Sequence, residues 1–225
     1  MVPKRKVVVT FGDSTTAPRS GVISYTEQIA PRFLGCRHAP RFVHSAGNEG
    51  ETTIHARRRF QKEVLDEKPT VVMIQFGIND SMVDVWLIPP ATTPRTPPDV
   101  FEENLRFFVK ECRAVGASVI LLTPQQLRWT PRMQKLFGRS PYRPEEERGF
   151  CVLLEEYVAV VRKVAGEWAV PLVDLYALYD TWEQTHLRSS GELLVDGVHP
   201  NTAGHTLAAE ALLPLVQRGL YAEGW

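Results

Sequence analysis

The chain has 225 residues, of which 44% are hydrophobic and 23% charged, and its 26 basic residues balance 26 acidic ones. This length suits one good hydrophobic core, so we expect a single domain over residues 1–225. The zero net charge argues against binding of nucleic acid or anionic membranes by bulk electrostatics, and no apolar run reaches the ~20 residues that span a bilayer.

The cysteines predict neither a disulfide framework nor a metal site. Cys36, Cys112 and Cys151 are odd in number and widely spaced, and no CxxC or HExxH pattern occurs. The basic start of the chain leads into a short Val-Val-Val-Thr-Phe run without a small-residue cleavage site, which indicates a strand and not a signal peptide. We therefore expect a cytoplasmic protein, or a secreted one if a leader was removed beforehand.

Five short apolar runs rich in β-branched residues are expected to be strands. They cover residues 6–11 (KVVVTF), 41–45 (RFVHS), 70–76 (TVVMIQF), 118–123 (SVILLT) and 170–175 (VPLVDL). The runs are nearly continuous and do not alternate with polar residues, which is typical of strands covered on both faces.

Segments with helical spacing lie between and after these runs, at residues 21–34, 53–67, 99–115, 145–167 and 201–217. The segment 99–115 has the clearest boundaries, because Asp99 can cap its start and Gly116 stands where a C-cap glycine is expected. Asn201 can cap the last helix in the same way. Alternating strands and helices predict a three-layer α/β/α sandwich around a five-stranded parallel sheet.

Two long segments fit neither pattern and follow strands at their carboxyl ends, where open α/β sheets bind ligands. Residues 83–98 contain five prolines, and residues 125–145 contain four arginines. Trp86, Trp129 and Tyr142 in these segments are candidate stacking surfaces for sugar rings; the alternative is that they anchor the loops to the core.

The first block with chemical potential is FGDST, directly after the first strand. A serine hydroxyl becomes a good nucleophile only when a base takes its proton, and Ser14 at the end of a buried strand is well placed for this. Gly-Asp-Ser is equally an ordinary turn sequence.

The second and third blocks offer hydrogen-bond donors to an oxyanion. In GNEGET, two glycines precede a helix and can expose backbone N–H groups, although a simple strand-to-helix turn explains them as well. In FGIND, the Asn79 side chain carries an NH2 donor, and its alternative role is an Asx-turn that ends the strand.

The fourth block, DGVHPN, places an aspartate three residues before a histidine across a tight turn. Asp196 can accept the Nδ1–H of His199, which leaves Nε2 free to act on a serine. The alternative is a capped turn that leads into the last helix.

In this order, the four blocks resemble the signature blocks of the SGNH (GDSL) hydrolase family, from residue 11 to residue 201. The resemblance implies a serine esterase without a cofactor, with the parallel sheet in flavodoxin-like order. It implies that Ser14 is the nucleophile and that Asp196 and His199 complete the triad. It assigns the oxyanion hole to the N–H groups of Ser14 and Gly50 and to the Asn79 side chain.

The chain departs from the family pattern in two blocks. Its first block reads GDST where many members have GDSL, which favours the branch resembling rhamnogalacturonan and other carbohydrate acetylesterases. Glu49 and Glu51 replace the more usual neutral and aspartate residues of the second block. Gly47 is the alternative oxyanion glycine; we prefer Gly50, because the family's glycine commonly precedes an acidic residue and a threonine.

The most specific hypothesis is hydrolysis of a short-chain acyl ester, acetyl above all, on a carbohydrate. The partner is then a small-molecule or glycan ester and not nucleic acid, and the oligomeric state is left open. A lipase or lysophospholipase is the second candidate, although no continuous apolar lid occurs in the sequence. A non-catalytic flavodoxin-like binding module is the third, but it leaves the joint presence of Ser14, Asn79 and His199 unexplained.

Overall fold

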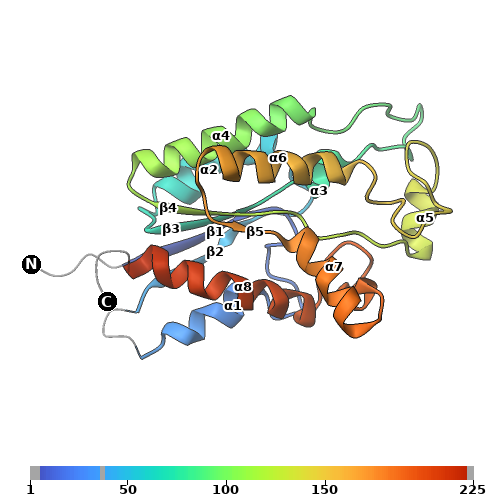
Figure 1. The fold of residues 1–225 in the computed structure, drawn as a ribbon. Helices are drawn as coiled ribbons and strands as arrows, with labels where there is room; N and C mark the ends of the chain where they lie inside the picture. Colours follow the sequence, from blue (N-terminus) through green and yellow to red (C-terminus); the bar gives the residue numbers. More distant parts are fainter. Residues whose placement is uncertain (1–5, 36–38, 222–225) are drawn as a thin grey trace, which may run out of the picture.

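The computed structural model describes residues 6–35 and 39–221 and contains a five-stranded parallel sheet in the order β2-β1-β3-β4-β5 (Figure 1). The strands are β1 (Val7–Gly12), β2 (Arg41–Gly47), β3 (Val71–Gln75), β4 (Ser118–Leu122) and β5 (Leu172–Val173). This is the doubly wound order of flavodoxin-like sheets, so the predicted fold class and strand order are confirmed.

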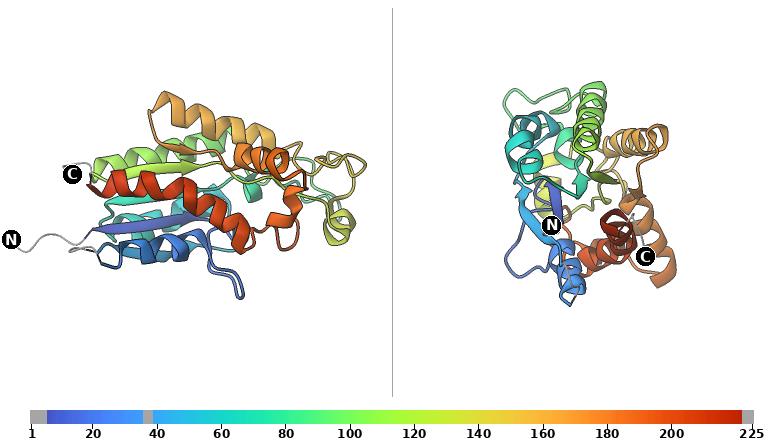
Figure 2. Two further views of the ribbon diagram at one scale, coloured as in Figure 1. Left: turned by 60° about the horizontal axis from the view of Figure 1, so that its bottom comes forward. Right: turned by 90° about the vertical axis from the view of Figure 1, so that its left-hand side faces the viewer.

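Helices cover both faces of the sheet and make the three predicted layers (Figure 2). One layer contains α2 (Thr53–Phe60), α4 (Pro98–Ala114) and α6 (Leu154–Glu167); the other contains α1 (Tyr25–Ile29) and α8 (Thr202–Tyr221). Alternate residues of β1 serve the two sides: Val9 and Phe11 pack in the same cluster as Phe108 of α4, and Val8 packs in that of Leu212 of α8. Burial of both strand faces explains the continuous apolar runs in the sequence.

Two predicted helices match closely. Helix α4 lies within one residue of the predicted 99–115 at each end, and α8 begins one residue after Asn201, whose side-chain oxygen accepts the Gly204 N–H at 3.0 Å. The predicted capping by Asn201 is therefore confirmed. Within the described residues, no helix is long and apolar enough to cross a membrane.

Other boundaries were predicted wrongly, for local reasons. The strand expected at 170–175 ends at Val173, because Asp174 caps α7 (Leu175–His186), a helix that the sequence analysis missed. The helix expected from residue 145 begins only at Leu154. The preceding residues form turns in which a Cβ on Gly149 would lie 1.7 Å from the Arg143 carbonyl oxygen.

The remaining differences concern short elements. The predicted helix 21–34 is α1 followed by a 3₁₀ turn over Ala30–Phe33, and 53–67 is α2 followed by a π turn over Gln61–Leu65. Two short helices, α3 (Ile78–Ser81) and α5 (Pro131–Phe137), were not expected. Cys112 and Cys151 are buried free thiols, and Cys36 lies outside the described residues.

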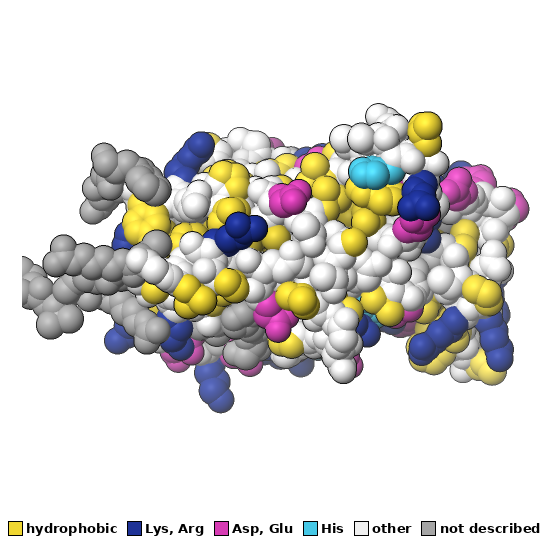
Figure 3. All heavy atoms as spheres, turned by 90° about the horizontal axis from the view of Figure 1, so that it is seen from below, with side chains coloured by type: hydrophobic (Ala, Val, Ile, Leu, Met, Phe, Trp, Pro, Cys, Tyr) yellow, Lys and Arg dark blue, Asp and Glu magenta, His cyan; other side chains and the backbone are white. Residues whose placement is uncertain are grey.

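The outer face of α1, α7 and α8 is mixed in character. Seen from below, its hydrophobic side chains are interrupted by polar and charged ones (Figure 3). Leu187, just after α7, is 90% exposed. The long loops and α5 lie at the opposite end of the molecule from the start of β1, beyond the carboxyl ends of the strands (Figure 1).

Candidate active site

Five residues singled out in the sequence line one cleft of about 410 Å³ at the carboxyl ends of the strands. Ser14 follows β1, Gly50 follows β2, and Asn79 lies on α3 directly after β3. Asp196 and His199 belong to the turn that leads into α8. Sheet order explains the convergence of Ser14, Gly50 and Asn79, because β1 lies between β2 and β3.

Ser14, His199 and Asp196 form one hydrogen-bonded chain. The Nε2 atom of His199 lies 2.9 Å from Ser14 Oγ, and its Nδ1 atom lies 2.8 Å from Asp196 Oδ2. A carboxylate only accepts hydrogen bonds, so Nδ1 carries the imidazole proton and Nε2 accepts the hydroxyl proton of Ser14. This is the geometry in which a histidine can act as a base toward a serine.

The turn that carries Asp196 and His199 is held in place by its own backbone. Asp196 Oδ1 accepts the N–H groups of Val198 (3.1 Å) and His199 (2.9 Å). Gly197 has a φ of +86°, and a Cβ there would lie 2.3 Å from the Arg128 carbonyl oxygen, so only glycine fits. The carbonyl of Gly197 accepts the Arg128 N–H at 2.9 Å, which ties the turn to the segment after β4.

Asp196 stays ionised because of these contacts. Its partial burial on its own would raise the pKa of the carboxyl group. Hydrogen bonds from the side chain and backbone of His199 and from the Val198 N–H outweigh burial and hold the pKa well below its usual range. A permanent carboxylate is what fixes the histidine tautomer.

Asp13 shapes the turn that presents Ser14. Its Oδ1 atom accepts both the N–H and the hydroxyl of Thr15 at 2.8 Å, and its carbonyl accepts the Thr16 N–H at 3.1 Å. The side chain is buried, and loss of hydration raises the pKa of Asp13 to about 6 despite the hydrogen bonds from Thr15. Within the FGDST block, only the neighbouring serine was predicted to act in the chemistry.

The two candidate oxyanion glycines occupy different environments. Gly47 ends β2, and a Cβ there would lie 2.4 Å from Thr16 Oγ1, so it packs beneath the Ser14 turn. Gly50 has a φ of +70°, lines the cleft and has no neighbouring atom within 4 Å of where a Cβ would stand. Of the two, only Gly50 is among the residues lining the cleft.

Asn79 and the adjacent Asp80 connect the third block to its surroundings. Asn79 Oδ1 accepts a hydrogen bond from Arg95 Nη1 at 3.1 Å. Asp80 is buried and accepts the N–H (2.9 Å) and the hydroxyl (2.6 Å) of Thr53, the first residue of α2. Burial raises the pKa of Asp80, and its contacts give it a structural role beside Asn79.

A model of the GDSL-like lipase/acylhydrolase family matches residues 10–207. The chain belongs to this family. It is 36% identical over 175 residues to an uncharacterised lipoprotein of Bacillus subtilis, covering 74% of this chain and 69% of the lipoprotein. It is 28% identical over 206 residues to an acetylxylan esterase of Geobacillus stearothermophilus, covering 90% and 82% of the two chains.

Solved structures give the same fold. A lipase/acylhydrolase from Enterococcus faecalis superimposes with a TM-score of 0.71 at 25% identity, over 98% of this chain and 100% of the other. The Geobacillus acetylxylan esterase superimposes with a TM-score of 0.72 at 24% identity, over 93% of each chain. Family membership and the curated esterase relative together identify this GDSL-family chain as an esterase.

The acidic residues that distinguish the second block of this GDSL-family chain have separate environments. Glu51 forms a salt bridge with Arg59 Nε at 2.5 Å, and Arg59 also donates to the Gly12 carbonyl at 3.0 Å. Glu49 is exposed and lines the cleft. The charge of Glu51 is therefore compensated beside the turn that carries Ser14, and Glu49 is the one of the two glutamates that lines the cleft.

None of the three aromatic residues predicted to bind sugar lines the cleft of this esterase. Tyr142 is only 4% exposed, and its hydroxyl accepts the Val83 N–H at 2.9 Å. It anchors one long loop to the other, which is the alternative that the sequence left open for this residue. Trp86 is 45% exposed and donates to Asp84 at 3.2 Å.

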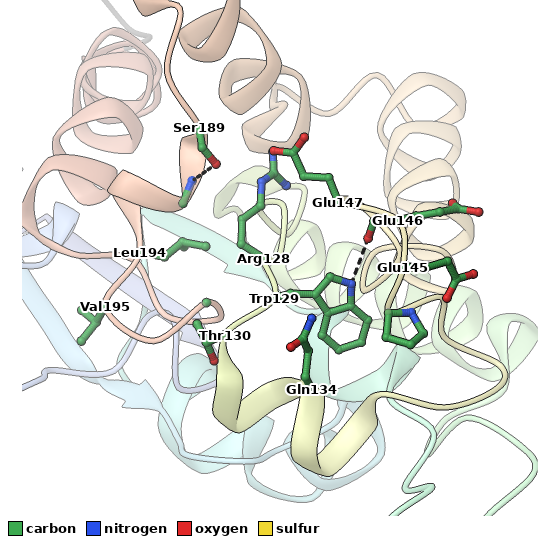
Figure 4. Close-up of a pocket in the computed structure, with 13 residues that line it drawn as sticks. Arg128, Trp129, Thr130, Gln134, Glu145, Glu146, Glu147, Ser189, Leu194 and Val195 are labelled. Carbon is green, nitrogen blue, oxygen red and sulfur yellow. Dashed lines mark hydrogen bonds between the residues drawn. The ribbon is translucent and has the colours of Figure 1, made fainter.

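Trp129 lines a different pocket, of about 590 Å³, together with Arg128, Glu146 and Leu194 (Figure 4). Its ring stacks on Phe150 at 4.6 Å, and its Nε1 donates to the Glu146 carbonyl at 3.0 Å. One ring face and the polar edge of Trp129 are therefore already occupied by the loop.

The cleft also contains residues to which the sequence motifs assigned no role. They comprise three arginines and five apolar side chains: Arg19, Arg95, Arg132, Ile78, Met82, Met133, Phe137 and Val198. Half of them, Arg95, Arg132, Met133 and Phe137, come from loop 83–98 and α5, where no sequence motif marks them. Ile78 and Val198 lie inside the FGIND and DGVHPN blocks, beside the polar residues that were predicted to act in the chemistry. Across the described residues, no group of three His, Cys, Asp or Glu side chains is arranged to hold a metal ion.

Proposed function

We propose that this esterase removes a short acyl group, acetyl, from a carbohydrate, with Ser14 as nucleophile and His199 and Asp196 as its triad partners. The observation that carries the proposal is the continuous chain from Ser14 Oγ through both nitrogens of His199 to Asp196, with contacts of 2.9 and 2.8 Å. No other serine has this arrangement among the described residues.

The reaction follows from that chain. Ser14 Oγ attacks the ester carbonyl carbon while His199 Nε2 takes the hydroxyl proton, and Asp196 stabilises the imidazolium that forms. His199 returns the proton to the leaving sugar oxygen, which leaves an acyl group on Ser14. A water molecule, deprotonated by His199, then attacks the acyl carbon and frees the carboxylic acid and the serine.

The negative oxygen of each tetrahedral intermediate needs donors that are already in place. The N–H groups of Ser14 and Gly50 and the NH2 of Asn79 have that role in our proposal. Gly50 lines the cleft with no atom within 4 Å of where a Cβ would stand, and Asn79 follows β3, the strand next to β1. Loss of one such donor typically costs about 10²–10³ in turnover.

Two observations support a short acyl group on a sugar. Buried apolar side chains, among them Met82, Met133 and Phe137, form one wall of the cleft and are packed into a continuous cluster. A closely packed wall gives room to a methyl group and resists a long chain. A curated relative that matches 90% of this chain is an acetylxylan esterase.

A lipase-type activity is the second candidate, because loop 83–98 exposes apolar side chains near the cleft. Trp86, Leu87 and Ile88 are 45%, 41% and 99% exposed. Such a tip suits contact with an apolar surface. Initial rates with p-nitrophenyl acetate, butyrate and octanoate, together with acetate release from acetylated xylo-oligosaccharides, decide between the candidates. An acetyl preference supports our proposal, and an octanoyl preference overturns it.

The test of the nucleophile uses Ser14→Ala with Ser20→Ala as its matched control, because Ser20 is exposed and outside the cleft. We expect Ser14→Ala to lose p-nitrophenyl acetate hydrolysis and labelling by a fluorophosphonate, and Ser20→Ala to keep both. Peptide mapping should place the label on Ser14. Parental turnover by Ser14→Ala contradicts the assignment, and an unlabelled, inactive parent favours a non-catalytic binding module.

A further inference from the structure

The amide of Asn79 has two chemically different ends, and only one can serve an oxyanion. The NH2 group donates hydrogen bonds, whereas Oδ1 accepts them and repels a negative oxygen. The two ends are nearly equal in size, so packing alone distinguishes them poorly. Rotating the amide by 180° would therefore replace a hydrogen bond to the oxyanion with repulsion from Oδ1. An enzyme that uses this donor needs a contact that fixes the orientation of the amide.

Arg95 supplies such a constraint. Its Nη1 donates to Asn79 Oδ1 at 3.1 Å, and a guanidinium has no acceptor atom with which the NH2 group of a turned amide could pair. The contact therefore selects the orientation in which Oδ1 faces Arg95 and the NH2 group faces away from it. The positive charge also draws electron density toward Oδ1, which makes the amide N–H a stronger donor.

Arg95 is itself held in place by Asp84 and by its own backbone. Its Nε and Nη2 donate to the two carboxylate oxygens of Asp84, at 2.9 and 2.6 Å. Its backbone N–H donates to the Met82 carbonyl at 2.9 Å. A bidentate arginine–carboxylate pair is geometrically specific, so the guanidinium has little freedom to leave Asn79.

We propose that Arg95, held by Asp84, is a positioning residue that orients the Asn79 amide for oxyanion stabilisation. This inference rests on the proposed function, in which Asn79 is an oxyanion donor. The inference gives loop 83–98 a role near its end. The chain leaves α3, forms an exposed tip around Ile88 and returns to place the Arg95 guanidinium against Asn79.

Direct binding of a substrate anion is a poorer explanation of Arg95. Its Nε and both terminal nitrogens already donate to Asn79 or Asp84, and Asp84 compensates its charge. Arg19 and Arg132 differ, because they line the same cleft and form no salt bridge within the part of the chain that the structure describes. Anion binding, if it occurs, is better suited to those two side chains.

The experiment is a double-mutant cycle with p-nitrophenyl acetate, in which kcat and KM are measured for the parent, Arg95→Met, Asn79→Ala and the double variant. We expect Asn79→Ala to lower kcat by about 10²–10³. Arg95→Met should lower kcat by about tenfold or more and change KM by less than about twofold, since the interaction operates in the transition state. In the Asn79→Ala background, Arg95→Met should have no further effect on kcat.

Two further variants separate positioning from general loss of structure. Arg95→Lys keeps one donor and a positive charge, so it should recover part of the lost kcat; Arg188→Met removes an exposed surface arginine and should match the parent. Unfolding midpoints of all variants are measured alongside. The inference is wrong if Arg95→Met keeps parental kcat, or if it lowers kcat by the same factor with and without Asn79. If Asn79→Ala itself keeps parental kcat, the proposed oxyanion role fails instead.

Discussion

Asp13 provides a quantitative test of the proposed site. Its ionised carboxylate lowers the stability of the fold, yet it favours the positive charge that forms on His199. The side chain is 1% exposed, forms no salt bridge in the described residues, and has a pKa raised from 3.8 to about 6. The positive charge of His199, when it forms, opposes this rise. The same attraction means that ionised Asp13 stabilises the imidazolium of the proposed mechanism.

The sign of the effect on stability follows from linkage. A carboxyl group whose pKa is raised on folding holds its proton more tightly in the folded state, so stability falls as pH rises from about 4 through about 6. Raising the pKa from 3.8 to about 6 corresponds to about 3 kcal/mol in the free energy of unfolding. Asp13→Asn removes this titration and keeps an acceptor for Thr15. We therefore expect the variant to gain up to about 3 kcal/mol relative to the parent between pH 4 and pH 8.

Urea unfolding of the parent and Asp13→Asn at half-unit steps from pH 4 to pH 8 measures the difference. Asp99→Asn, an exposed change from acid to amide, is the control and should show no comparable step. At pH 8 the Asp13→Asn variant should also be the slower enzyme, because the imidazolium loses a nearby negative charge. A stability difference that is constant from pH 4 to pH 8 refutes the reasoning.

Three other predictions test the packing around the site. Gly47→Ala places a Cβ 2.4 Å from Thr16 Oγ1, so it should lower the unfolding midpoint and p-nitrophenyl acetate turnover together. His205 is buried and its pKa is lowered to about 4, chiefly by burial; stability should therefore fall as pH drops from about 6.5 to 4, and His205→Phe should weaken this fall in thermal unfolding scans. Tyr142→Phe removes the acceptor for the Val83 N–H and should cost about 1–3 kcal/mol in urea unfolding.

The sequence predicted those parts of the site whose geometry is local or follows from sheet order. Asp196 and His199 are three residues apart, and the turn between them determines their contact. Ser14 and Asn79 follow two strands that the sheet places side by side, so strand assignment was enough to bring them to one edge. Roles in catalysis for these residues stay predictions until the variants are measured.

The sequence did not predict contacts that depend on how a long loop folds back. Asn79 and Arg95 are separated by 16 positions, and Tyr142 reaches Val83 across 59. No periodicity or motif in the sequence marks either pair. The contacts within a long loop depend on where the folded core fixes the two ends of that loop. Asp174 is a partial exception: it carries a recognisable N-cap signal for α7, but the apolar run around it was interpreted as strand.

Loop 83–98 therefore divides into two parts with different constraints. At its base, backbone hydrogen bonds join Arg95 to Met82 and Thr96 to Asp80, and these bonds tie the loop to the third block. At its tip, Leu87 and Ala91 both donate to the Asp84 carbonyl, which closes a short turn that exposes the side chains of Leu87 and Ile88. Substitutions at the tip can change which molecules the loop contacts without moving Asn79. Substitutions at the base act on Asn79, the proposed oxyanion donor. Asp84 belongs to both parts, because its carbonyl closes the tip and its carboxylate holds Arg95. A change at the tip that moved Asp84 would therefore affect Arg95 and, through it, Asn79.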